Sequence, residues 1–269
     1  MAYAPQTPYM VSNLPQDIHQ AAYAAQLGDQ PRAEYRPTTT VKNIVWGILC
    51  LILGLGLLAA GVILAGQAPD AASGGLISDL CGLFFIVGAF YLLLYGVIYK
   101  SWCVYVYERG FVYKKGSKAA QPFRWDQIEA AWYSVTRRYY NGVYTGTTHY
   151  YRVRRSDGYE IVLNDRFTKV GELGELVHNR VTAVKLPQVI AAYNASQTIT
   201  FGPLSLNTQG IWNSNGKLLP WPEIKDVSIQ QGYVAVSKAG KWLRWSSQPV
   251  RTIPNVFLFI ALVRSILKK

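Results

Sequence analysis

Arginine and tyrosine residues are interleaved in one stretch of this chain, between residues 133 and 155. The stretch contains Arg137, Arg138, Tyr139 and Tyr140, followed by Arg152, Arg154 and Arg155. In a β-strand, Arg152 and Arg154 share a face with Tyr150. A guanidinium binds phosphate bidentately, and a tyrosine ring suits a lipid interface or a nucleotide base. The same pattern is typical of a solvated edge hairpin whose charges prevent edge-to-edge association, so both interpretations stay open.

Signatures of catalysis and of metal binding are absent from the sequence. There is no phosphate-binding glycine loop, no Gly-x-Ser-x-Gly elbow and no zinc-protease helix. The three cysteines show no paired spacing, and the three histidines have no partner at metal-ligand spacing. We therefore expect no enzyme, no cofactor and no metal site.

Two long apolar runs must position everything else in the chain. They cover residues 44–66 and 76–99, within a segment of residues 42–100, and Asp79 is their only charged residue. Each run is long enough as a helix to cross a hydrocarbon core of about 30 Å, which predicts a two-helix transmembrane hairpin. A carboxylate in a membrane helix can mark an ion path, but Asp79 stands near the start of its run. We expect it to cap the start of that helix together with Ser78.

The flanks of the two runs predict their orientation. Basic residues precede the first run and follow the second, whereas residues 67–75 between the runs contain no Lys or Arg. The positive-inside rule then places both chain termini in the cytoplasm and the connecting loop outside. We expect a multi-pass protein of the plasma membrane.

Small residues recur every seven positions in both runs and predict how the two helices pair. Folding the chain back about its loop pairs Gly47 with Gly96, Gly54 with Ala89, and Gly61 with Gly82. Small residues along such a seam allow two helix backbones to approach closely in lipid. We expect this seam to hold the hairpin together.

The segments on either side of the runs differ in composition. Residues 1–41 contain five prolines and few large apolar side chains, which predicts a disordered cytoplasmic tail. The exception is residues 15–27, where Ile18, Ala21, Ala22 and Ala25 could share one face of a weak helix. From Lys100 onward the chain carries 24 basic and 10 acidic residues, within a protein of net charge +12. A region this basic beside a bilayer is drawn to its anionic inner leaflet.

The region after the runs contains a duplicated pattern. Gly110-Phe111 parallels Gly210-Ile211, and the step from Trp125 to Ile128 parallels the step from Trp221 to Ile224. Alternating segments with turn residues between them, among them Asn141-Gly142, predict antiparallel hairpins, and each copy ends in a helix-like segment. We expect six or seven strands closed by one C-terminal helix, twice over. The first copy carries extra residues, which fall in the arginine- and tyrosine-rich stretch.

This pattern resembles a bacterial pleckstrin-homology-like (PH-like) domain, and the Trp-x-x-Ile steps carry the resemblance. The region also resembles a family of uncharacterised membrane-associated proteins with two such units, known only as a domain of unknown function. The resemblance implies an antiparallel barrel or sandwich at residues 101–185, a helical connector at residues 186–196 and a second barrel at residues 197–269. It also implies binding of lipid head groups, peptides or proteins. The phosphoinositide-binding subset uses a basic cluster in its first hairpin, where this chain has Lys114 and Lys115 without matching that pattern closely.

The leading hypothesis is a non-enzymatic integral membrane scaffold or adaptor. It would present its tandem PH-like domains to the cytoplasm and bind anionic lipid head groups or a protein partner. One alternative is a small channel or transport subunit built from oligomerised hairpins, and another is a membrane-tethered nucleic-acid binder. Membrane proximity favours the leaflet over nucleic acid as the anionic partner, and the sequence specifies no oligomeric state.

Overall fold

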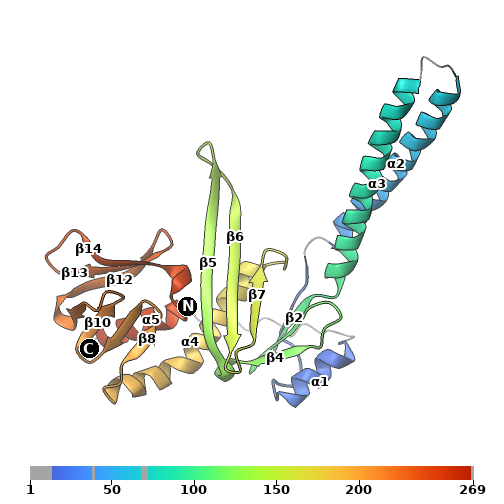
Figure 1. The fold of residues 1–269 in the computed structure, drawn as a ribbon. Coiled ribbons are helices and arrows are strands. Elements are labelled where there is room, and N and C mark those ends of the chain that lie inside the picture. Colours follow the sequence, from blue (N-terminus) through green and yellow to red (C-terminus); the bar gives the residue numbers. More distant parts are fainter. Residues whose placement is uncertain (1–13, 38–39, 68–71, 268–269) are drawn as a thin grey trace.

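Two long helices and a set of β-sheets occupy separate parts of the molecule (Figure 1). The computed structural model describes residues 14–37, 40–67 and 72–267. Helices α2 (Thr40–Gln67) and α3 (Ala72–Lys100) form an antiparallel hairpin that projects away from the sheets. The helices predicted at residues 44–66 and 76–99 are confirmed, and each begins several residues before its apolar run.

Both helices are apolar on nearly all sides and bury little of that surface against each other. Trp46, Phe84 and Phe90 are 61%, 75% and 65% exposed. The apolar spans contain 25 and 26 residues, with mean hydropathies of 2.8 and 2.3. These lengths exceed what a hydrocarbon core of about 30 Å requires. Both helices are therefore long and apolar enough to span a membrane.

Small residues line the contact between α2 and α3, but in a different register from the predicted one. The glycines of α2 face small residues of α3 in three pairs: Gly47 with Ala89, Gly54 with Gly82, and Gly61 with Gly75. A Cβ at Gly54 would lie 2.9 Å from the Gly82 carbonyl oxygen, so the backbones do approach closely. The predicted register is therefore wrong, because each predicted partner on α3 lies seven residues after the observed one. The two helices extend further into the segment that connects them than the apolar runs indicate, which shortens the loop between them.

Ser78 and Asp79 lie inside α3, so the predicted capping role at the helix start is wrong. The helix begins at Ala72, before both residues. The Ser78 hydroxyl donates to the Leu57 carbonyl oxygen at 2.7 Å, which ties the two helices together. Asp79 packs against Gly61, where an added Cβ would lie 2.0 Å from its Oδ1 atom. The small residue at position 61 therefore makes room for the carboxylate.

The first group of sheets, called unit 1 here (residues 14–37 and 101–185), includes chain from both sides of the helical hairpin. One sheet has the order β1 (Ala33–Tyr35), β2 (Cys103–Val106), β3 (Gly110–Lys114) and β4 (Gln121–Arg124). β1 pairs antiparallel with β2, and Tyr35 lies opposite Val104. The hairpin of α2 and α3 is thus an insertion between two neighbouring strands. Both segments that flank it meet at the same end of the hairpin.

The N-terminal segment contributes to unit 1, so the prediction of a disordered tail over residues 1–41 is wrong for residues 14–37. Helix α1 (Gln16–Ala24) buries Ile18 and Ala22, and with Leu27 they contact Tyr105 and Val112 of the sheet. These few apolar side chains form no core of their own. They cover a sheet face that is supplied by residues beyond the helical hairpin, and burial there stabilises the segment. Residues 1–13 lie outside the described residues.

A second, three-stranded sheet completes unit 1. It has the order β5 (Ile128–Tyr140), β6 (Val143–Arg155) and β7 (Glu160–Asn164). Large apolar side chains from both sheets meet in one core, in which the Phe111 and Phe123 rings stack at 4.9 Å between centroids. A short 3₁₀ turn, η2 (Trp125–Gln127), connects β4 to β5.

Helix α4 (Val170–Asn194) is shared by both groups of sheets. Its first half packs Leu173 and Val177 into the core of unit 1, and its second half packs Ile190 and Tyr193 against the core of the next unit. The predicted separate connector at residues 186–196 is therefore wrong, because the helix continues through Pro187. Apolar contacts on both halves keep the helix continuous although proline removes one backbone hydrogen bond.

Unit 2 (residues 197–267) has the same order of sheets followed by a helix. Its four-stranded sheet contains β8 (Ile199–Phe201), β9 (Leu204–Asn207), β10 (Gly210–Asn213) and β11 (Leu218–Pro220). The 3₁₀ turn η3 (Trp221–Glu223) leads into a second sheet of β12 (Ile224–Gln230), β13 (Tyr233–Lys238) and β14 (Arg244–Pro249). The 3₁₀ turn η4 (Val250–Thr252) then leads to α5 (Val256–Leu267), which buries Leu258, Phe259 and Leu262.

The duplicated sequence positions make matching contacts in the two units. The Trp125 indole donates to the Glu108 carbonyl oxygen at 3.0 Å, and the Trp221 indole donates to the Asn207 carbonyl oxygen at 2.9 Å. A Cβ at Gly110 would lie 2.1 Å from a carbonyl oxygen of β4, and a Cβ at Gly210 would lie 2.1 Å from one of β11. Each glycine therefore permits a close approach of two strands at the same place in its unit.

Candidate anion-binding site

The arginine- and tyrosine-rich stretch forms a long hairpin from β5 and β6. Each of these strands has 13 residues, whereas β12 and β13 in unit 2 have 7 and 6. The hairpin closes at Asn141 and Gly142, with φ of 48° and 78°, as the predicted turn requires. Figure 1 shows it rising beyond the other strands, toward the same side of the molecule as α2 and α3.

The end of the hairpin is exposed and basic. Tyr139 and Tyr140 are 60% and 72% exposed, and the Tyr139 ring contacts that of Tyr144 at 5.9 Å between centroids. Arg137 and Arg138 are also exposed, and neither has an ion pair within the residues that the structure describes. As neighbours on one strand they point to opposite faces of the hairpin. This end therefore offers cations and aromatic rings on both faces.

Lower on the hairpin, arginine side chains gather on one face around a tryptophan. The guanidinium of Arg152 lies 3.8 Å from the centre of the Trp132 ring, and that of Arg154 lies 5.2 Å from it. Tyr150 lines the same pocket as Arg152, so the predicted shared face of β6 is confirmed. The indole stabilises both cations through its π-face.

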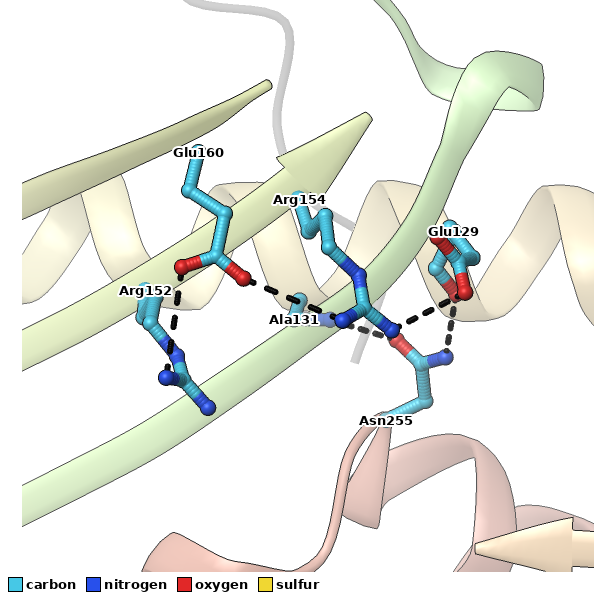
Figure 2. Close-up of polar contacts among 6 residues, drawn as sticks. All are labelled: Glu129, Ala131, Arg152, Arg154, Glu160 and Asn255. Atoms are coloured by element: carbon cyan, nitrogen blue, oxygen red, sulfur yellow. Dashed lines mark hydrogen bonds and ion pairs between the residues drawn. The ribbon is translucent and has the colours of Figure 1, made fainter. Parts of the chain in front are cut away.

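Arg154 is bound to two carboxylates, whereas Arg152 is held loosely (Figure 2). Arg154 donates to Glu129 at 2.9 Å, and its other terminal nitrogen lies 3.9 Å from Glu160. Arg152 also lies 3.9 Å from Glu160, which is its only ion pair among the described residues. Of these two arginines, Arg152 has the more available charge.

A pocket of about 390 Å³ opens beside Arg152. Four of its lining residues come from β5 and β6 of unit 1, and one comes from η4 of unit 2: they are Trp132, Ser134, Tyr150, Arg152 and Arg251. Arg251 is exposed and has no ion pair in the described part of the chain. The pocket thus combines two available guanidinium groups with two hydroxyl groups.

The contact between the units that frames this pocket depends on Asn255. Its side chain accepts from the Ala131 amide and donates to the Glu129 carbonyl oxygen, both at 2.9 Å (Figure 2). Its own amide donates to the Ala131 carbonyl oxygen at 2.8 Å. These three bonds attach unit 2 to the free edge of β5, only four residues beyond Arg251.

An aromatic cluster lies beneath the same contact. His178 of α4 packs edge-on against Tyr133, Tyr151 and Phe257, which come from both units. Burial lowers the pKa of His178 to about 4, although a hydrogen bond with the Trp132 backbone opposes the shift. His178 is therefore neutral at physiological pH and belongs to the packing between the units.

The remaining predicted site residues have partners inside unit 1. Arg155 donates to Asp157 and to the Pro122 carbonyl oxygen, both at 2.6 Å. The hydrogen bond from Arg155 lowers the pKa of Asp157 to about 2. Lys114 pairs with Asp17 of α1 at 2.5 Å, and Lys115 lies 4.8 Å from the centre of the Trp102 ring. The structure places these three residues away from the hairpin tip and from the pocket.

Sequence reasoning missed Trp132, Ser134 and Arg251. Trp132 and Ser134 share the face of Arg152 by simple alternation along paired strands, so period-two spacing could have found them. No local signal identifies Arg251, because only the docking of unit 2 brings it to the hairpin. Among the described residues, no group of three His, Cys, Asp or Glu is close enough to hold a metal ion.

Comparison with known proteins gives one match. A model described as a family of unknown function (DUF6585) matches residues 1–269, which confirms the expectation of a family known only as a domain of unknown function. No curated protein and no solved structure matches the chain.

Proposed function

This chain belongs to the family of unknown function DUF6585, and we propose that it is a membrane-anchored, non-enzymatic binding protein. In this proposal α2 and α3 span the plasma membrane, and two PH-like units lie in the cytoplasm. The long hairpin of unit 1 contacts the anionic inner leaflet. The observation that carries the proposal is the exposed, unpaired basic and aromatic tip of β5 and β6, on the same side as the apolar helices.

The base of the helical hairpin supports membrane insertion. The rings of Tyr95, Tyr99 and Trp102 lie in series where α3 meets unit 1. The contact between Tyr95 and Tyr99 is tilted and that between Tyr99 and Trp102 is edge-on, with centroid distances of 4.3 Å and 4.7 Å. Arg166 lies 5.2 Å from the Tyr99 ring, and Lys115 lies over Trp102. Aromatic rings beside cations are typical of the boundary between hydrocarbon and water on the cytoplasmic side.

The pairing of β1 with β2 supports placing both flanks of the helices in one compartment. An even number of spans returns the chain to the side from which it started, as this pairing needs. Basic residues dominate both flanks, and the residues between the helices carry none, so the positive-inside rule selects the cytoplasm.

The order of elements supports PH-like units. Each unit has a four-stranded and a three-stranded antiparallel sheet followed by a helix, with matching tryptophan and glycine contacts. Such units serve as binding modules, and in this chain only the first has an elongated hairpin. We therefore assign leaflet binding to unit 1.

Amide hydrogen exchange of the full-length protein in nanodiscs tests the proposal. Discs of phosphatidylcholine are compared with discs that also contain phosphatidylglycerol. We expect slower exchange for residues 137–146 in the anionic discs only, because the tip lies at the lipid interface there. The double variant Arg137→Gln/Arg138→Gln should lose this protection.

Arg180→Gln is the matched control, since Arg180 is an exposed residue of α4 without an ion pair among the described residues. It should leave the protection unchanged. Equal exchange in both kinds of disc, or full protection in the double variant, would contradict leaflet binding by the hairpin.

A further inference from the structure

The pocket between the units has the chemistry of a phosphate site. Arg152 and Arg251 line it from different units, and Ser134 of β5 and Tyr150 of β6 line it as well. We propose that this pocket binds a phosphate ester, bridged between the guanidinium groups of Arg152 and Arg251.

The state of Arg152 favours an anion over any other ligand class. Its guanidinium lies over the Trp132 ring at 3.8 Å, and this contact with a π-face uses none of its N–H groups as hydrogen-bond donors to oxygen. Its carboxylate neighbour Glu160 lies 3.9 Å away and is shared with Arg154, so it satisfies these donors poorly. Two planar forks and two hydroxyl groups match the several oxygens of a phosphate group.

The local charge balance points the same way. Arg152 and Arg154 pair with two carboxylates, those of Glu129 and Glu160, and Arg251 adds a third guanidinium group to the lining of the pocket. A bound anion would neutralise the remaining positive charge. Because Asn255 fixes η4 against β5, the second arginine is already in place before any ligand arrives.

The position of the pocket on the hairpin indicates the source of the phosphate. Ser134 lies six residues before Tyr140, which is about 20 Å along a strand. If the tip lies at the lipid surface, as the proposed function states, the pocket lies well below a head-group layer of about 5–8 Å. The ligand is then a water-soluble phosphate ester, and this last step alone depends on the proposed function.

Isothermal titration of the full-length protein in phosphatidylcholine nanodiscs tests the site, with inorganic phosphate and pyrophosphate as probes at constant ionic strength. We expect saturable binding with one site per chain. Arg152→Gln and Arg251→Gln should each raise Kd roughly 10- to 100-fold, because each removes a charged hydrogen bond to the ligand. Arg251 is exposed and makes no ion pair within the described chain, so its variant keeps the test valid if Arg152→Gln fails to fold.

Two controls separate this site from the leaflet contact. Arg180→Gln should bind the probes with unchanged affinity, and so should Arg137→Gln/Arg138→Gln. Phosphatidylglycerol in the discs should not compete with pyrophosphate if the ligand is water-soluble, whereas competition would assign the pocket to a lipid head group. Absence of saturable binding, or equal affinity in Arg251→Gln and the parent protein, would overturn the proposal whether or not the hairpin binds the leaflet.

Discussion

A single buried histidine makes the joint between the two units sensitive to acid. His178 contacts Tyr133, Tyr151 and Phe257, and burial lowers its pKa from 6.5 to about 4. The unfolded chain therefore takes up a proton at higher pH than the folded chain does. The contribution of neutral His178 to the free energy of unfolding is fully present above pH 6.5. It is lost as the pH drops toward 4, by up to about 1.4 kcal/mol per pH unit and roughly 3 kcal/mol in total.

Urea unfolding followed by tryptophan fluorescence between pH 4 and pH 7.5 measures this dependence. His178→Gln should flatten the acid-induced loss, since glutamine does not titrate. His19→Gln, at an exposed position of α1, should leave the loss as it is. An unchanged pH profile in His178→Gln would assign the acid sensitivity to other groups.

Two glycines at matching positions permit the close strand contacts of the two units. An alanine Cβ at Gly110 or Gly210 would lie 2.1 Å from a main-chain carbonyl oxygen, which cannot rotate away. We expect Gly110→Ala and Gly210→Ala each to lower the free energy of unfolding by about 1–3 kcal/mol. Gly56→Ala is the control, because open space surrounds that position on α2. Comparable losses in all three variants would exclude the steric explanation.

For single residues, the sequence predicted the position of a side chain correctly where that position depends only on alternation along its own strand. Alternation placed Arg152, Arg154 and Tyr150 on one face of β6, and Asn141-Gly142 identified the turn. Alternation could not show which basic residues are available. Arg155 is bound by Asp157 of the following turn and by the Pro122 carbonyl oxygen of β4, and Lys114 is bound by Asp17 of α1. The contacts with Pro122 and Asp17 depend on tertiary packing.

Among the elements, the docking of η4 on β5 holds unit 2 in place beside the hairpin. Asn255 has a positive φ of 53°, and its side chain makes two of the three hydrogen bonds at this contact. Asn255→Gly keeps that backbone conformation and removes both side-chain bonds. We expect the free energy of unfolding to fall by about 1–3 kcal/mol, measured by urea unfolding.

Gln231→Gly is the matched control for that variant. Gln231 also has a positive φ, of 52°, but lies in an exposed turn. It should change stability little. If both variants lose the same stability, the side-chain bonds of Asn255 contribute nothing to the joint.

Because α2 and α3 are inserted between β1 and β2, we expect unit 1 to fold without these two helices only if α1 and β1 are kept. A variant in which six Gly and Ser residues replace residues 38–100 keeps α1 and β1 and should be soluble and folded. A fragment of residues 101–269 lacks both elements and exposes the apolar sheet face around Tyr105 and Val112. We expect that fragment to aggregate or to unfold at lower urea concentration. Equal stability of the two would contradict the role of β1.

For the molecule as a whole, the amino-acid sequence predicted the order of helices and strands better than it predicted which distant segments contact one another. The apolar runs and alternating segments correctly indicated two long helices followed by antiparallel sheets and a C-terminal helix. The contribution of residues 14–37 was missed, because β1 and its partner strand β2 are separated by the 67 residues 36–102, which include the helical hairpin. The joint between the units was missed because Asn255 and Arg251 act on a strand far away in the chain.

In the proposed function, α2 and α3 anchor both units at the cytoplasmic face of the membrane. Protease added to intact cells and to inverted membrane vesicles tests it most directly, with antibodies against the N-terminal segment and against unit 2 as readouts. We expect both flanks to stay intact in whole cells and to be digested in inverted vesicles. Digestion of unit 2 by protease outside intact cells would contradict it.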